Sequence, residues 1–177
     1  NLNKGIQKVI EQINMLIDEI LNGKLDRRGD PDDVMIDFKK VMFGVNDLID
    51  SFTEPMKLVE NYVQRIADGD IPPKITADYK GDFNNLKNNI NACVDAINGL
   101  LTETKTMINS VKDGKLNIKG REDLFKGEWA HLVSEINELS NVLIAPINFM
   151  AEYVDQIAKG NIPPKITETY KGDFNKA

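Results

Sequence analysis

A long internal repeat constrains the fold of this chain more than any other feature. Residues 69–84 read GDIPPKITADYKGDFN and residues 160–175 read GNIPPKITETYKGDFN, which are identical at 13 of 16 positions and lie 91 residues apart. The distance of 91 residues contains two shorter repeats, because four glycines and four aromatic residues each recur every 45 or 46 residues. They are Gly23, Gly69, Gly114, Gly160 and Phe38, Phe83, Trp129, Phe174. The chain therefore consists of four tandem units of about 45 residues, arranged as two similar pairs.

Apolar residues between these marks advance by alternate steps of 3 and 4, the pattern of a coiled coil. Three such seams of 29 residues run from Phe38 to Ile66, from Phe83 to Val111 and from Trp129 to Ile157. The same phase runs from Leu2 to Ile20, so the chain starts within a helix of this kind. At 1.5 Å per residue, each seam predicts a helix about 44 Å long.

The ends of these predicted helices carry suitable capping residues. Each glycine follows the last seam residue, where a left-handed C-terminal cap costs no Cβ clash. Each aromatic is preceded by an acid, which we expect to accept the free N–H groups that open the next helix. These acids are Asp37, Asp82, Glu128 and Asp173.

The connectors of about 13 residues are longer than a turn between antiparallel helices requires. Extended, they cover roughly 40 Å, enough to run back along one helix and start the next one parallel to it. We expect two apolar anchors to hold each connector to the helices: Ile71 with Ile75, and Ile162 with Ile166. Leu25 and Leu116 are the first anchors of units 1 and 3, but Gly29 and Gly120 stand at the second. Those two connectors should be looser, unless Val34 or Leu124 substitutes.

Two parallel helices cannot bury the whole apolar face, which is wider than a strict seam because Met56, Leu58 and Val63 lie beside it. A second copy of the chain would cover it. We therefore expect an all-α fold of stacked parallel four-helix coiled-coil bundles, formed by a homodimer, with extended connectors. Successive bundles share a helix, since the second helix of one unit continues as the first helix of the next.

The unit boundaries follow from this sharing. We place unit 1 at 1–52, unit 2 at 53–97, unit 3 at 98–143 and unit 4 at 144–177, with a truncated second helix in unit 4. Pro55 and Pro146 fall inside two of the shared helices, where an interior proline kinks the helix. The junction through Gly99 has no proline, so we expect two kinked junctions and a straight one.

Composition excludes several classes of function. The net charge is −6, from 22 Lys and Arg against 28 Asp and Glu, and the absence of a basic run argues against nucleic acid as a partner. No apolar stretch approaches the roughly 20 residues that span a bilayer, so this segment should not insert into a membrane. With one His, one Cys and no recurrent acid–base set, the chain reads as neither an enzyme nor a metal or cofactor protein.

These features resemble the tandem HAMP arrays of bacterial and archaeal chemoreceptors (methyl-accepting chemotaxis proteins) and related sensor kinases. A HAMP unit has a first helix that often opens with Pro, a Gly at its end, a connector with two apolar anchors and an acid that starts the second helix. The matching residues are Pro55, Gly69, Ile71, Ile75, Asp82 and Pro146, Gly160, Ile162, Ile166, Asp173. The string IPPKIT followed by YKGDFN carries most of the specificity. Units 1 and 3 depart from the pattern at the second anchor.

The resemblance implies a signal relay between a sensor on the N-terminal side and a kinase-control domain on the C-terminal side. It places the chain in the cytoplasm, as part of an inner-membrane receptor or of a soluble one. A wide apolar face allows two packings of four helices, so a change of helix rotation in one unit would impose a change on the next. Two alternatives share part of the pattern: a dimeric spacer that does not switch, and a helical-repeat scaffold such as HEAT or armadillo.

Overall fold

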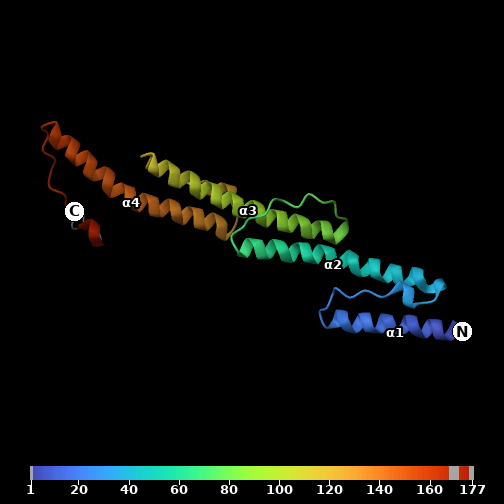
Figure 1. Cartoon of the computed structure of the whole chain (residues 1–177). Coiled ribbons are helices and arrows are strands. Elements are labelled where there is room, and N and C mark those ends of the chain that lie inside the picture. Colours follow the sequence, from blue (N-terminus) through green and yellow to red (C-terminus); the bar gives the residue numbers. More distant parts are fainter. Residues whose placement is uncertain (1, 168–171, 176–177) are drawn as a thin grey trace. The chain divides into compact units, whose positions relative to one another are not determined.

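The computed structural model describes residues 2–167 and 172–175, without the side chains of residues 173 and 175. Helices are the only regular structure in these residues. The order is α1 (Leu2–Leu21), η1 (Pro31–Asp33), η2 (Ile36–Phe38), α2 (Lys39–Ala67), α3 (Gly81–Lys112), η3 (Glu122–Leu124), α4 (Glu128–Ala158) and η4 (Gly172–Asn175) (Figure 1). The three seams predicted over 38–66, 83–111 and 129–157 correspond to α2, α3 and α4, which confirms the all-α fold class.

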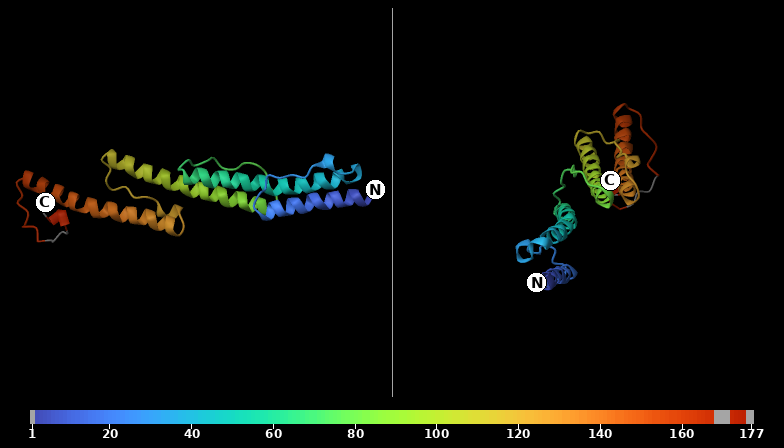
Figure 2. Two further views of the ribbon diagram at one scale, coloured as in Figure 1. Left: turned by 60° about the horizontal axis from the view of Figure 1, so that its bottom comes forward. Right: turned by 90° about the vertical axis from the view of Figure 1, so that its right-hand side faces the viewer.

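The chain divides into two compact parts, residues 1–91 and 92–177. In the first part, the chain returns from the end of α1 to its start before α2 begins, so the two helices run in the same direction (Figures 1 and 2). The segment between α2 and α3 makes the same return. In the second part, the C-terminal half of α3 and α4 are likewise parallel, with residues 113–127 running back between them. Long connectors thus serve parallel helices, as their length predicts.

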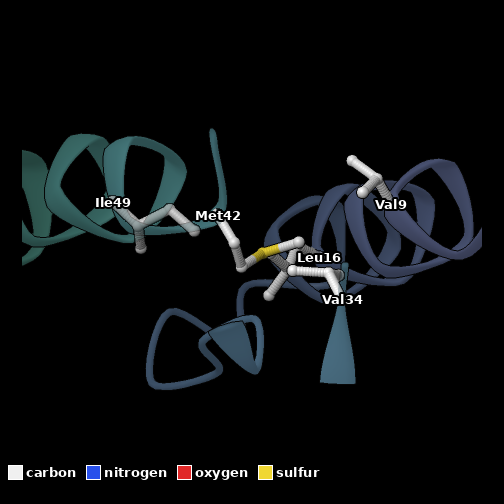
Figure 3. Close-up of a cluster of buried hydrophobic side chains, with 5 residues drawn as sticks. All are labelled: Val9, Leu16, Val34, Met42 and Ile49. Carbon is white, nitrogen blue, oxygen red and sulfur yellow. The ribbon is translucent and has the colours of Figure 1, made fainter. Parts of the chain in front are cut away.

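The core of the first part forms where two helices meet their connector. Val9 and Leu16 come from α1, Val34 from the connector, and Met42 and Ile49 from α2 (Figure 3). The Met42 side chain extends from α2 toward Leu16 and Val34, and it has no solvent exposure. The connector is therefore part of the core.

A second contact in this part joins α2 to the start of α3. The rings of Phe52 and Phe83 meet edge to face with centroids 5.6 Å apart, an arrangement that aromatic pairs favour. Pro55, Ile75 and Phe83 line one small cavity at the same place. The structure thus brings together the proline and the second anchor of unit 2.

Candidate functional site

The connectors and the side chains that hold them form the candidate site, and each begins with the same cap. Gly23, Gly69, Gly114 and Gly160 have φ of 77°, 79°, 76° and 82°, the left-handed conformation that their position predicts. After each glycine, the next N–H donates to the carbonyl five residues back, at 2.8–2.9 Å. This pair of features is a Schellman cap, in which glycine avoids the Cβ penalty. All four helices therefore end alike.

The anchors differ between connectors. Leu25, Ile71 and Leu116 are half-buried, and Ile75 is buried at 7% exposure. In contrast, Ile162 is 92% exposed and Ile166 is 43% exposed. The anchor role of these two residues stays a prediction.

We expected the connectors of units 1 and 3 to be looser because glycine stands at their second anchor. The structure corrects this expectation. Gly29 and Gly120 are both buried. A Cβ at Gly29 would lie 2.0 Å from the sulfur of Met42, and one at Gly120 would lie 2.8 Å from the sulfur of Met107. Helix side chains thus occupy the volume that Ile75 fills in unit 2. In unit 1, Val34 adds to this packing at 6% exposure.

The corresponding substitute in unit 3 is Phe125, not Leu124. Leu124 is 56% exposed. A Cβ at Gly99 would lie 3.1 Å from the Phe125 ring, so the ring packs against α3 at this glycine. Phe125 lies 91 residues after Val34, which makes the two residues equivalent in the repeat.

In units 1, 2 and 3, an asparagine of the second helix binds the backbone of the residue at the second anchor position. Asn46 accepts from the N–H of Gly29 at 2.8 Å and donates to its carbonyl at 2.8 Å. Asn91 does the same to Ile75 at 2.7 and 3.0 Å, and Asn137 to Gly120 at 2.7 and 2.9 Å. Each asparagine lies eight residues after the aromatic of its unit. We call these three residues the asparagine clamps.

The clamp role of these asparagines was not predicted, although their common spacing is visible in the sequence. Each asparagine satisfies the donor and the acceptor of one connector residue, groups that would otherwise be costly to bury. The clamps therefore fix the connector to the second helix independently of whether an apolar anchor is present.

The first helix holds the connector by two alternating devices. In units 2 and 4, a tyrosine hydroxyl donates to a proline carbonyl: Tyr62 to Pro73 at 2.8 Å, and Tyr153 to Pro164 at 3.0 Å. In units 1 and 3, a side-chain oxygen instead accepts a backbone N–H, as in the bond from Asp30 to Gln12 at 2.7 Å. The four units are thus two pairs in contacts as well as in sequence.

The acids that precede Phe38, Phe83 and Trp129 do not stand at the N-cap positions of α2, α3 and α4, contrary to expectation. Asp82 and Glu128 lie in the first turns of α3 and α4, while Asp37 lies in η2 just before α2. The residues before α2 and α4, Phe38 and Gly127, show no side-chain cap hydrogen bond. For Asp82 and Glu128 the position still places a negative charge at the positive end of the helix dipole. The side chain of Asp173 lies outside the described part.

The prolines sit inside continuous helices. Pro55 is buried within α2 and Pro146 is buried within α4. Each helix therefore passes from one predicted unit into the next without a break. The kinks expected at these residues stay a prediction.

Much of the apolar seam is exposed in the single chain. Val41, Leu48 and Phe52 of α2 are 46%, 59% and 57% exposed. In the second part, Trp129, Leu132, Leu139 and Leu143 of α4 are 43–59% exposed. Each part therefore keeps large apolar side chains that its own residues cover only in part. None of the described helices has the length and apolar character needed to cross a bilayer.

Parallel helices, left-handed glycine caps and clamped return connectors define a class of helical repeat module. The chain belongs to the HAMP domain family, which it matches over residues 36–99 and 124–177. No solved structure is significantly similar to it. HAMP domains are signal-relay modules rather than catalysts, and they function in dimeric receptors with neighbouring domains. The two matched segments support a tandem array.

Proposed function

We propose that this chain is the relay segment of a bacterial or archaeal chemoreceptor. In this proposal, it works as a parallel homodimer and passes a conformational change from a sensor domain to a kinase-control domain of the same receptor. The receptor is cytoplasmic in this region, whether its sensor is attached to the inner membrane or soluble. The four units follow the boundaries 1–52, 53–97, 98–143 and 144–177.

The proposal rests on the unequal burial of the two sides of the apolar helix face. The unit 1 connector covers one side of α1 and α2, where Leu16, Met42 and Ile49 are at most 7% exposed. On the other side, Val41 and Leu48 remain 46% and 59% exposed in the single chain. A second copy would complete a four-helix bundle on that side. Because the face is wider than a seam, two rotations of the helices can bury similar areas.

Phase-shifting insertions test the switching mechanism. We would insert four residues after Phe52 in α2, which shifts the helix phase, and compare an insertion of seven, which preserves it. The readout is disulfide formation between copies at Leu100→Cys, on the seam, or at Leu101→Cys, beside it, each in a Cys93→Ser background. We expect the four-residue insertion to move crosslinking from position 100 toward position 101.

A non-switching spacer predicts a different result. In that case both insertions would leave the ratio of the two crosslinks as it is without an insertion. A helical-repeat scaffold predicts no crosslink at either position, because its helices would pack within one chain.

A further inference from the structure

The connectors of units 1 and 3 each tie two adjacent residues to two different helices. In unit 3, Gly120 is bound by Asn137 of α4, while the N–H of Arg121 donates to Glu103 of α3 at 2.8 Å. In unit 1, Gly29 is bound by Asn46 and the next residue, Asp30, by Gln12. The connector thus links the two helices at one dipeptide. A movement of one helix against the other must stretch these bonds.

The dipeptide link of unit 3 contains an ion pair, whereas the unit 1 connector forms ion pairs with the two helices at other residues, including Asp33 with Lys8 and Arg28 with Asp50. Glu103 lies 91 residues after Gln12, and Arg121 lies 91 residues after Asp30, so the residues are equivalent in the repeat. The guanidinium of Arg121 donates to Glu103 through Nη2 at 3.0 Å, in addition to the backbone bond. The Glu103 side chain is only 6% exposed, whereas that of Arg121 is 65% exposed. At the same place, units 2 and 4 carry the apolar Leu58 and Phe149.

The bonds explain how a carboxylate can be buried here. The hydrogen bonds that Arg121 donates hold the pKa of Glu103 below its ordinary value, since they favour the charged form. Other charges near the pair are Asp95 on α3 and Lys126 on the connector, which line the same hollow, with Asp123 close to Arg121. From α4, the residue that lines this hollow is the uncharged Trp129. Glu103 therefore stays ionised at neutral pH with Arg121 as its partner.

We propose that Glu103 is a positioning residue for the relay: its ion pair with Arg121 latches the unit 3 connector to α3, and α3 changes its packing only when this latch opens. The inference rests on the proposed switching function. Charged hydrogen bonds are roughly twice as strong as neutral ones, and the guanidinium of Arg121 adds one to the backbone bond of unit 3. In unit 1, the equivalent Gln12 holds Asp30 by two neutral bonds, one from its N–H and one to its carbonyl, and also donates to Asp33 at 3.3 Å. A rotation of α3 would displace the carboxylate from both of its donors.

The first test isolates the latch itself. Glu103→Gln in the full chain removes the ion pair but keeps an acceptor for the Arg121 N–H, as Gln12 does for Asp30. Glu122→Gln is the matched control, because it removes the same charge from an exposed side chain of η3. At neutral pH, we expect the protection of the Arg121 amide against hydrogen exchange to fall about tenfold in E103Q and to stay unchanged in E122Q. The Asp30 amide should be unchanged in both variants.

The second test asks whether the latch controls packing. In E103Q, without any insertion, we expect disulfide formation at Leu101→Cys to rise relative to Leu100→Cys, as a four-residue insertion does in the parent chain. Unchanged protection of the Arg121 amide in E103Q would overturn the latch. If E103Q loses protection of the Arg121 amide but keeps the same crosslink ratio as E122Q, Glu103 has no role in the relay. It then only holds the connector in place.

The parent chain separates this failure from failure of the proposed function. If the four-residue insertion also leaves the parent crosslinks unchanged, the relay by repacking is wrong. If the insertion moves them while E103Q does not, the relay stands and only the latch is refuted.

Discussion

The side-chain amide of Asn46 holds the backbone of Gly29 by two hydrogen bonds, both 2.8 Å long, across 17 residues of sequence. The same pairing recurs at Ile75 and Gly120, so it is a property of the repeat rather than of one unit. It fastens an irregular connector to a helix. The connector thereby becomes a mechanical element of the bundle.

Removing one asparagine clamp should destabilise the chain measurably. Asn137→Ala leaves the N–H and carbonyl of Gly120 without their partner, and we expect the free energy of unfolding to fall by about 2 kcal/mol. Asn141→Ala, an exposed asparagine one turn later on α4, is the control and should cost little. Denaturant unfolding at fixed protein concentration measures both. Equal effects of the two variants would show that the clamp does not contribute to stability.

A side chain at Gly29 should collide with the core. In Gly29→Ala, the new Cβ would lie 2.0 Å from the sulfur of Met42, and overpacking of this kind costs about 1–3 kcal/mol. The double variant with Met42→Ala should lose less than the two single costs combined, because the smaller side chain makes room. The coupling comes from a double-mutant cycle in denaturant. Additive costs would mean that Met42 does not occupy the anchor volume.

The glycine caps should respond differently from a helical glycine. Gly69 has φ of 79°, so Gly69→Ala should destabilise by about 1 kcal/mol. Gly44 lies within α2 with open space around its Cβ position, and Gly44→Ala should stabilise by about 0.5–1 kcal/mol. Thermal unfolding of both variants gives opposite shifts if this account is right. A shift of the same sign would contradict the left-handed cap.

The contribution of Glu103 to the free energy of unfolding should decrease in acid. Because the pKa of Glu103 is lowered in the fold by the hydrogen bonds from Arg121, its contribution is full above the ordinary value of 4.5 and is lost as the pH falls through the lowered value. Between pH 7 and about 4.5 this contribution should be constant. Unfolding of the parent chain and E103Q, compared over pH 2.5–7, should give curves that converge in acid. A constant difference over this range would contradict the assignment.

The sequence predicted the helices well because their signal is local and repeated. The seam over 38–66 differs from α2, Lys39–Ala67, by one residue at each end. The left-handed glycines and the parallel direction of the helices follow from cap chemistry and from connector length. These inferences needed no knowledge of which side chains meet.

Tertiary contacts were harder to predict, and the failures share a cause. Each of Asn46, Asn91 and Asn137 looks like an ordinary polar residue on a helix. Their common spacing after the aromatic sets them apart, but it does not show that a connector passes beside them. The glycines at the second anchor suggested a loose connector, yet the volume is filled by Met42 and Met107 from helices far along the chain. Leu124 was predicted to substitute for the second anchor of unit 3, and this prediction was wrong by one position. The sequence does not show that the neighbouring Phe125 packs against α3.

Association of two parallel copies is the central claim, and it is tested by the chain's single cysteine. Cys93 lies on the α3 seam and is exposed in the single chain, so in a parallel dimer the two copies of Cys93 face each other. Mild oxidation with mass measured by light scattering at micromolar concentration provides the test. The account predicts a mass of twice 19.9 kDa before oxidation and a Cys93–Cys93 disulfide after it. A folded particle of 19.9 kDa that forms no such disulfide would contradict it.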